Sequence, residues 1–434
     1  MILIKNKLFL FKVTITIIGL YIRTSWCHSD YQSLLKNSDI YIKYIPNNKF
    51  KNKNFLFSSN YTAIKFMTGD EKNEQITKLK DIIRFNTVVN TTNFSFYKQL
   101  DDYEKQFYDI IYLKSSQPLP ELDIDVLITG ITVDLQTYYD KMKSLLEKIF
   151  TVLAYENPEL WWIGDIILEG IAGDEPNSLI FTFHMISPES EFSEYSREQI
   201  FEINKEIEKE KKNIMEKIKT IGLTTNYAIL RYIHDYLVTK NVYTLDNSIK
   251  HIRTLYGGLV EGKCTCEGYA EAFQYLARQY NINCIISRSS SHEWNFVEMK
   301  GKWYILDASY DDPVIEDMDI SSGKNGNLQL DYFLTGTDHV SQVNYPKYSE
   351  DTAHTLVYTA YGSGRKLVTY PTIEKNDYIP SEEEKKELDL IDFTFKDIFD
   401  GVFNNKYTTI NTLLWKELSN NYCMEDGITN DDDI

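Results

Sequence analysis

The sequence predicts a folded protein of the α+β class, and three observations carry this prediction. Hydrophobic residues make up 43% of the 434 residues and only 10 residues are Pro, so the chain has the material for a sizeable buried core. Several segments repeat their apolar residues at the spacing of an α-helix. Two strand-like runs flank Lys300-Gly301, where the glycine suits a tight hairpin turn.

The first 27 residues have the order of a secretory signal peptide. Two lysines precede a mostly apolar stretch over residues 8–22, and Ser25-Trp26-Cys27 offers the small residues that suit a signal peptidase. Lys12 and Arg23 interrupt the apolar run, which leaves too short a span for a stable membrane helix. We therefore expect a secreted, extracellular protein with no stable membrane span after cleavage. An uncleaved signal anchor and a buried N-terminal strand are the alternatives.

The N-terminal half of the chain contains four further predicted elements. Residues 28–96 are rich in Asn, Lys, Tyr and Phe, and they include one predicted edge strand at 40–45. One helix is predicted around 103–112 and another over 133–155, and residues 179–183 predict a strand. The second helix places its apolar residues on one face: Met142, Leu145, Leu146, Ile149 and Leu153.

The clearest helix start lies at Ser196, which forms a capping box with Gln199. An apolar stripe follows: Ile200, Ile203, Ile207, Ile214 and Ile218. The many Glu and Lys residues of this helix predict a solvated opposite face. A further helix is predicted over 226–238. Toward the C-terminus, an acidic helix at 381–388 and an acidic tail at 431–433 are interpreted as solubilising.

Charge and cysteine content exclude several classes of function. The 46 basic residues are outnumbered by 64 acidic ones, and the net charge of −18 argues against a nucleic acid or an anionic membrane as partner. Five cysteines are too few for a disulfide scaffold, and they do not form the two close pairs of a structural zinc site. We therefore expect no nucleic-acid partner and no metal.

The residues that carry chemistry lie between Gly262 and Pro313, where Cys266, His292 and Asp307 follow one another in a short span. Helical spacing after the cysteine is shown by Tyr269, Ala270, Phe273, Leu276, Ala277 and Tyr280. Cys266 is therefore predicted at or just before a helix N-terminus. The helix dipole and the backbone amides there stabilise a thiolate, the reactive form of cysteine.

A hairpin is predicted to bring the histidine and the aspartate together. Strand-like runs at 283–288 and 294–299 precede the turn at Lys300-Gly301. Pairing the residues that flank this turn makes His292 the diagonal neighbour of Asp307 on the same face. Diagonal Cβ atoms lie roughly 7 Å apart, within reach of a hydrogen bond between the two side chains. A slip of one residue would put them on opposite faces.

The motifs Cys-Glu-Gly-Tyr-Ala, His-x-Trp-Asn and Gly-Lys-Trp-Tyr-x-x-Asp with a trailing Asp-Asp-Pro resemble the transglutaminase-like superfamily, most of all its microbial stand-alone thiol domains. The resemblance covers about residues 98–320. It implies a papain-like α+β core, with the nucleophile helix packed on an antiparallel sheet and a mostly helical region before it. It also implies that Cys266 is the nucleophile, His292 the general base and Asp307 the residue that orients His292.

The chain departs from the family pattern at a few positions near this site. Glu293 stands where the family usually has a small residue, and Cys264 two residues before the nucleophile is unusual. We expect Cys264 to be dispensable for chemistry and Cys284, flanked by isoleucines, to lie in the core. A zinc site built from the cysteines and His292 has poor spacing for a tetrahedral ion.

With the resemblance, the chain divides into six predicted regions. They are a signal peptide (1–27), an N-terminal region without a readable role (28–96), an α/β region before the core (97–222), a transglutaminase-like catalytic core (223–320), a C-terminal extension of that core (321–380) and an acidic helical tail (381–434).

The function that follows is that of a thiol enzyme, either a cysteine peptidase or amidase or a protein-glutamine acyltransferase. Cys266 would attack a protein or peptide amide, form a thioester and pass the acyl group to water or to an amine, with hydrolysis slightly favoured. No cofactor is expected, and no loop indicates calcium. The alternatives are a catalytically silent secreted binding or scaffold domain that keeps the fold, and hydrolysis of a non-peptide amide. The sequence does not indicate an oligomeric state.

Overall fold

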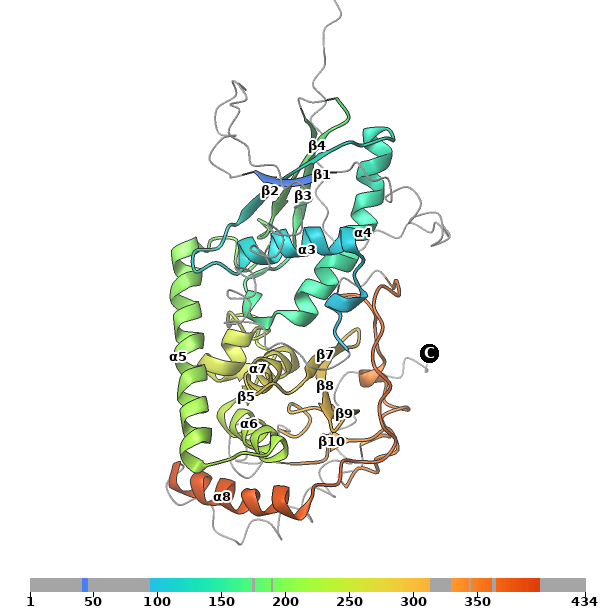
Figure 1. Ribbon diagram of the computed structural model, residues 1–434. Coiled ribbons are helices and arrows are strands. Elements are labelled where there is room, and N and C mark those ends of the chain that lie inside the picture. Colours follow the sequence, from blue (N-terminus) through green and yellow to red (C-terminus); the bar gives the residue numbers. More distant parts are fainter. Residues whose placement is uncertain are drawn as a thin grey trace, which may run out of the picture. The chain divides into compact units, whose positions relative to one another are not determined.

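The computed structural model describes residues 41–45, 94–173, 176–188, 190–312, 329–342, 345–360 and 364–398. This part of the chain has the α+β character that the sequence predicts, with helices and two four-stranded antiparallel sheets (Figure 1). The chain divides into two compact units. The described residues of the first unit fall within 1–86, 96–202 and 358–368, and those of the second fall within 87–95, 203–357 and 369–434.

Three predicted features lie outside the described residues. They are the signal peptide at 1–27, most of the region 28–96 and the acidic tail at 431–433. Among the helices that the structure does describe, none combines the length and the apolar character needed to cross a bilayer.

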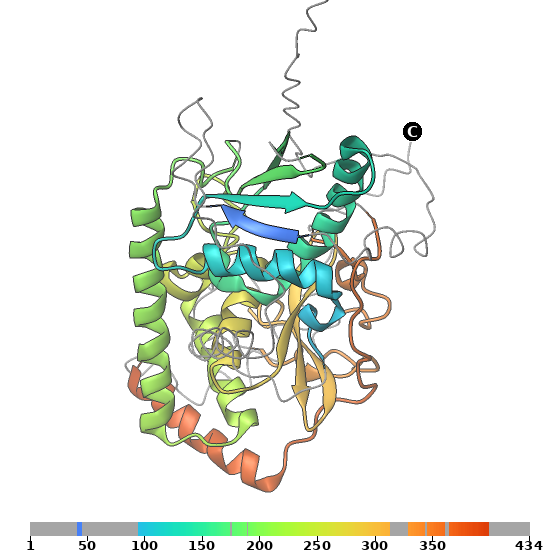
Figure 2. The same cartoon turned by 45° about the horizontal axis from the view of Figure 1, so that its top comes forward.

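The first unit is built on an antiparallel sheet in the order β1 (Tyr41–Ile45), β2 (Asp123–Thr129), β4 (Leu179–His184) and β3 (Ile167–Ala172) (Figure 2). The predicted edge strand is confirmed as β1, which pairs with β2 at one end of the order. The predicted strand 179–183 is confirmed as β4, in the interior of the sheet. β2 and β3 have no counterpart among the predicted elements. β3 contains Gly170, where a Cβ atom would lie 2.5 Å from the ring of Tyr139.

Both helices predicted in this unit are confirmed, as α3 (Asp102–Ser115) and α4 (Leu135–Glu156). Phe107 of α3 and Phe150 of α4 both contact Phe183 of β4, with ring centroids 6.5 and 5.8 Å apart. The two helices therefore bury apolar side chains against the sheet, as their helical spacing requires.

The long helix α5 (Arg197–Ile221) begins as predicted. The Ser196 backbone N–H donates to Gln199 Oε1 at 2.8 Å, and the Gln199 backbone N–H donates to Ser196 Oγ at 3.3 Å, so the capping box is confirmed. The face predicted to be solvated is partly engaged, because the Tyr275 hydroxyl donates to Glu208 at 2.6 Å. Some carboxylates of α5 therefore anchor tyrosines of the second unit's core.

The second unit contains an antiparallel sheet in the order β10 (Phe333–Thr335), β9 (Lys302–Leu306), β8 (Glu293–Met299) and β7 (Cys284–Arg288). The predicted hairpin register is confirmed as far as Asn295 opposite Leu306. Lys300 and Gly301 both have positive φ angles, of 52° and 78°, which is the conformation of a type I′ turn. The short strand β10 has no counterpart among the predicted elements.

Two helices of this unit pack together, α6 (Asn226–Lys240) and α7 (Cys266–Arg278), and both confirm predicted helices. α7 also packs on β7 and β8, where the Asn295 side-chain amide donates to the carbonyl of Ala270 at 3.0 Å. The helix that begins at Cys266 therefore lies against an antiparallel sheet.

Glycines allow the first turn of α7 to be packed closely from the other side. A Cβ atom at Gly258, in the π-helical turn Gly257–Glu261, would lie 2.1 Å from the carbonyl oxygen of Gly268. A Cβ atom at Gly268 would lie 2.5 Å from that of Cys264. Neither position has room for a side chain, so the start of the helix is held in place by backbone contact.

The predicted acidic helix is present as α8 (Glu382–Ile398), and its acidic residues do more than solubilise. Glu387 accepts hydrogen bonds from the backbone N–H groups of Thr224 and Thr225, both at 3.0 Å, and Thr225 is the N-cap of α6. Glu384 is buried and accepts from the Tyr378 hydroxyl at 2.7 Å. The first turns of α8 are therefore part of the folded second unit.

Candidate active site

Cys266 occupies the position that the sequence predicts, at the first residue of α7. The side chain of Thr265, the N-cap, does not cap the helix. It donates instead to Glu267 Oε2 at 2.8 Å. The thiol is free and only 4% of the residue is exposed. It lies at the end of the helix where the dipole favours negative charge.

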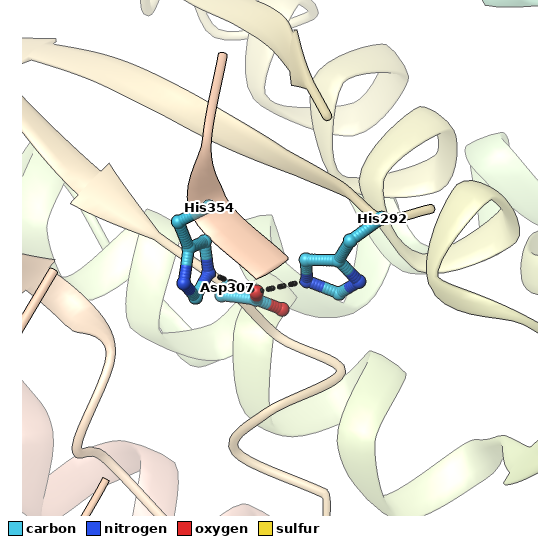
Figure 3. A group of neighbouring side chains, drawn as sticks. All are labelled: His292, Asp307 and His354. Atoms are coloured by element: carbon cyan, nitrogen blue, oxygen red, sulfur yellow. Dashed lines mark hydrogen bonds and ion pairs between the residues drawn. The ribbon is translucent and has the colours of Figure 1, made fainter. Parts of the chain in front are cut away.

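His292 and Asp307 form the contact that the hairpin register predicts (Figure 3). His292 Nε2 lies 2.5 Å from Asp307 Oδ2, and the two side chains are 8% and 1% exposed. A tight turn before β8 fixes the histidine backbone, because the His292 N–H donates to Ser289 Oγ at 2.9 Å. The imidazole also stacks on the indole of Trp294, with centroids 5.8 Å apart. These contacts hold the ring in one orientation.

Cys266 also acts on the His292 ring. Burial alone would lower the pKa of His292, but the charges of Asp307 and Cys266 and the hydrogen bond to Asp307 hold this pKa well above its usual value. Because Nε2 faces Asp307, Nδ1 is the ring nitrogen that is left for a sulfur. The structure therefore brings His292 and Asp307 into direct contact, and it places Cys266 near enough for its charge to act on the same imidazole.

Asp307 is held on its second oxygen by the residues that follow it. Oδ1 accepts from the Ser309 backbone N–H at 3.1 Å, the Ser309 hydroxyl at 2.8 Å and the Tyr310 backbone N–H at 3.1 Å. Burial would raise the pKa of Asp307, but the charge and hydrogen bonds of His292 and His354 hold it well below its usual range. The carboxylate therefore stays ionised and accepts hydrogen bonds on both oxygens.

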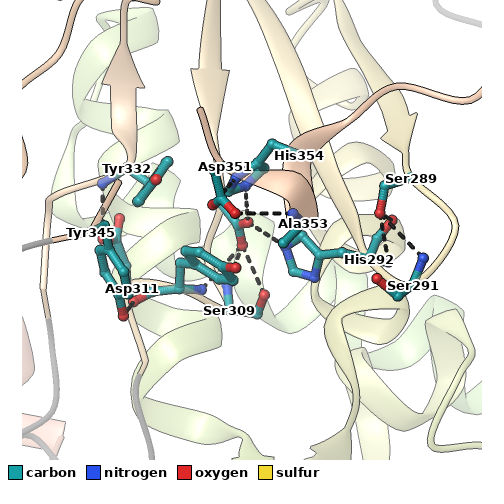
Figure 4. A network of polar contacts seen from close by, with 12 residues as sticks. Ser289, Ser291, His292, Ser309, Asp311, Tyr332, Tyr345, Asp351, Ala353 and His354 are labelled. Carbon is teal, nitrogen blue, oxygen red and sulfur yellow. Dashed lines mark hydrogen bonds and ion pairs between the residues drawn. The ribbon is translucent and has the colours of Figure 1, made fainter. Parts of the chain in front are cut away.

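A second histidine, which the sequence did not indicate, also contacts Asp307. His354 Nε2 lies 3.0 Å from the same oxygen, Oδ2, and His354 Nδ1 lies 2.7 Å from Asp351 Oδ2 (Figure 4). Asp351 caps the short 3₁₀ helix Thr352–His354. An aspartate three residues before a histidine is a local capping pattern, and nothing in it points to Asp307, which lies 47 residues earlier.

The two imidazoles and the carboxylate also have the composition of a metal site. The possible ligand atoms of His292, Asp307 and His354 all lie within 4.8 Å of one another. Both nitrogens contact a single oxygen at 2.5 and 3.0 Å, which are hydrogen-bond distances, and the other oxygen of Asp307 is occupied by three donors. These contacts favour a hydrogen-bonded network.

An ionic cluster lies beside the thiol. Glu267, the residue after Cys266, accepts from Arg253 Nη1 at 2.7 Å and from Arg288 Nη2 at 3.1 Å. Arg288 also lies 3.4 Å from Glu293. Burial raises the pKa of Glu293 to about 7. Glu293 is therefore a buried carboxyl, partly protonated at neutral pH, next to His292 in the chain.

A buried network supports the loop that carries Asp307. His234 lies 2.9 Å from Asp235 through Nδ1 and 3.0 Å from Asp311 through Nε2, and Arg231 contacts both oxygens of Asp235 at 2.8 Å. His234 and Asp235 both lie in the interior of α6 and are buried. They connect α6 to the turn after β9 through Asp311.

The other described cysteines differ from Cys266 in their surroundings. Cys264 and Cys284 are both fully buried and free. Burial raises the pKa of each thiol well above its usual value. Both are therefore held as neutral thiols, and Cys284 lies in the core as predicted.

No protein family model and no curated protein matches the chain. Among solved structures, the chain is similar to one described as the crystal structure of a TGase, with a TM-score of 0.24 and 13% sequence identity. This similarity covers 53% of the present chain and 60% of the other, so the chain spans less than two thirds of the length of that protein. The similarity is weak, and function has to follow from the chemistry of the side chains.

Proposed function

We propose that this protein is a thiol enzyme of the transglutaminase-like type, which attacks amide carbonyls of proteins or peptides through Cys266, His292 and Asp307. The observation that carries the proposal is the 2.5 Å contact between His292 and Asp307, made by an imidazole on which the charge of Cys266, at the start of a helix, also acts. A nucleophile, a base and a residue that orients the base are the three parts that such catalysis requires.

The proposed reaction has two steps. In the first, the Cys266 sulfur attacks the amide carbon while His292 holds the thiol proton, and this proton goes to the leaving amine as the C–N bond breaks. In the second, water or an amine attacks the thioester carbon and gives a proton to His292. The C–S bond then breaks, and His292 returns the proton to the sulfur, which restores the thiol. Asp307 keeps the imidazole in the tautomer and orientation that both steps need. The Cys266 backbone N–H is a natural donor for the oxyanion.

Two further proposals accompany this function. The core predicted within 223–320 is papain-like, which is supported by α7 lying on the antiparallel sheet that contains β7, β8 and β9. The protein is secreted, which is supported by the order of charged, apolar and small residues within 1–27. N-terminal sequencing of protein recovered from the culture medium tests secretion, since a chain that still begins at Met1 contradicts cleavage.

The function is tested first by the reactivity of the thiols. Iodoacetamide at neutral pH, followed by mass spectrometry, should modify Cys266 far faster than Cys264 or Cys284, because both of these are buried neutral thiols. Cys266→Ala should abolish turnover of a peptide or glutamine substrate and leave the melting temperature nearly unchanged. Cys264→Ser is the matched control and should keep most activity. Turnover that survives in Cys266→Ala contradicts the proposal.

A catalytically silent binding domain is the second candidate, and one observation favours it. Cys266 is only 4% exposed, so the thiol is largely covered in this conformation. A silent domain would show no product over a broad panel of peptides and glutamine-containing proteins. It would also show no preferential alkylation of Cys266.

A further inference from the structure

We propose that His354 is a positioning residue of this site, held doubly protonated between Asp351 and Asp307, and that its positive charge limits how strongly Asp307 attracts the proton of His292. The inference rests on the proposed function in one respect only, namely that His292 acts as the base. The protonation of His354 and of His292 can both be measured without a substrate.

One oxygen of Asp307 is shared by two imidazoles. Asp307 Oδ2 lies 2.5 Å from Nε2 of His292 and 3.0 Å from Nε2 of His354. Figure 3 shows the carboxylate between the two imidazoles, whose ring centroids are 5.3 Å apart at an interplanar angle of 85°. Any change of charge on one ring is therefore transmitted to the other through a single carboxylate oxygen.

Each ring nitrogen of His354 faces a carboxylate oxygen. An ionised carboxylate only accepts hydrogen bonds, so a ring nitrogen facing it has to donate. On one side His354 Nε2 faces Asp307, and on the other Nδ1 faces Asp351 Oδ2 at 2.7 Å. Oδ1 of Asp351 accepts the Ala353 backbone N–H at 2.9 Å. With both carboxylates ionised, both ring nitrogens donate, and the proposed state of His354 is an imidazolium.

Little else near His354 carries charge that could offset its own. Aromatic rings surround it, with Tyr332 stacked at 5.1 Å, Trp294 at 4.8 Å, and Tyr310 and Tyr348 at 4.9 and 5.2 Å. Burial raises the pKa of Tyr310 and of Tyr332 above the usual tyrosine value, so these hydroxyls stay neutral. The side chain is 0% exposed, and water does not screen its charge.

The result is a row of alternating charge that runs from His292 to the cap of the 3₁₀ helix. A lone Asp307 would hold the His292 proton tightly, whereas the base has to release that proton to the leaving amine. The cation at His354 draws on the same carboxylate and weakens this hold. The ring is thus suited to tune the base without touching a substrate.

The test is ¹⁵N NMR of the full-length protein with labelled histidines, assigned by single substitutions. We expect both ring nitrogens of His354 to be protonated at neutral pH. In His354→Gln, whose amide can still donate to Asp307, the pH at which His292 loses its proton should rise by roughly one unit, because a like charge at this range has been removed. If His354 were only structural, His354→Gln would change the melting temperature and leave the titration of His292 unchanged.

The control and a second variant make the outcome decisive. His339 is the matched control, because it also contacts two aspartates, Asp377 at 2.8 Å and Asp331 at 3.5 Å, and neither of them is Asp307. His339→Gln should therefore leave the His292 titration unchanged. Asp351→Asn keeps a helix cap, and it should free one His354 nitrogen of its proton and shift His292 in the same direction as His354→Gln.

Three results would overturn the proposal. They are a His354 ring with one unprotonated nitrogen in the wild-type protein, an unmoved His292 titration in both variants, and His354 signals that change on adding EDTA, which would indicate a bound metal. None of these depends on turnover. Failure of the proposed function is recognised separately, by activity that persists in Cys266→Ala.

Discussion

Asp307 accepts five hydrogen bonds in a buried position. Two reach Oδ2 from His292 and His354, and three reach Oδ1 from Ser309 and Tyr310. A carboxylate held on both oxygens has no alternative orientation, so the imidazole that it aligns has none either. At the scale of the single residue, the site is organised around this side chain.

The sequence predicts one part of this arrangement and cannot predict another. The contact between His292 and Asp307 follows from a two-residue turn, because the turn fixes the register and the register fixes which side chains share a face. The contact of His354 with Asp307 follows from no local rule. It depends on the path of the chain after β9, and a single sequence carries no information about such a long-range pairing.

Replacing Asp307 by Asn should slow the alkylation of Cys266 at neutral pH and lower turnover by on the order of 10⁴-fold. Both imidazoles face Oδ2 of Asp307, and an Asn side chain has only one acceptor oxygen to offer in place of the carboxylate. Loss of the negative charge also makes His292 a weaker base. The measurements are the alkylation rate and the initial rate with a peptide substrate. Asp338→Asn, at an exposed aspartate, is the control. Wild-type rates in Asp307→Asn would show that the carboxylate is not needed.

Glu293 predicts a pH dependence of stability. Burial raises its pKa to about 7 in the folded protein, whereas an unfolded glutamate titrates near about 4.3. Between these values the unfolded chain ionises first, so the free energy of unfolding should fall as pH rises from about 4.3 to about 7 and then level off. Glu293→Gln should reduce this fall. Urea denaturation at several pH values measures it, and equal slopes for both proteins would contradict the expectation.

At the scale of elements, the predicted helices and strands share strong local signals. The helix α5 has a capping box, α7 has apolar residues at helical spacing, and the β8–β9 hairpin has a turn with glycine. Two strands that escaped prediction, β3 and β10, lack such signals. β3 is interrupted by Gly170, whose role is to admit the ring of Tyr139, and β10 is too short for alternation to be recognised.

The helix α8 shows how an element can be predicted while its role is not. An acidic run is usually a solvated surface, and here one of its carboxylates caps another helix. Burial opposes ionisation of Glu387, but hydrogen bonds from Thr224 and Thr225 hold its pKa below the usual value. The positive end of the α6 dipole favours the same negative charge.

Glu387→Gln should therefore destabilise the protein by about 1 kcal/mol at pH 7, the usual cost of losing a cap. Because the folded pKa is lowered, the stabilisation is present above the unfolded pKa and is lost as pH falls through the folded one. The difference in stability between Glu387→Gln and the wild type should thus vanish in strong acid. Thermal melts of both proteins at pH 7 and in strong acid measure this difference. Glu383→Gln, at an exposed position of the same helix, is the control.

At the scale of the whole molecule, the α+β class could be predicted because helical and strand periodicities both occur in the chain. The division into two compact units could not, because residues 358–368 belong with 96–202 although 155 residues separate the two segments along the chain, from 203 to 357. No linker composition marks either crossing. Contact between distant segments decides such boundaries, and local pattern does not record it.

The triad does not select the acceptor of the acyl group. The acceptor is whichever molecule, water or an amine, can reach the thioester. A net charge of −18 draws cationic amines toward the surface, but screening limits this attraction to roughly 8 Å at physiological salt. At the site itself, Cys266 is 4% exposed and the His292 side chain 8%, and water is the smallest acceptor that could enter so covered a place.

We therefore expect hydrolysis to exceed amine transfer. The measurement is incubation of a glutamine-containing protein with a fluorescent primary amine, with new N-termini and released ammonia assayed in the same reaction. Cys266→Ala gives the background for each product. Ammonia or new N-termini well above the incorporated amine is the expected result, since each turnover would then end with water on the thioester. Amine incorporation that dominates, and that is lost in Cys266→Ala, would mean that the covered site opens to amines and excludes water during the second step.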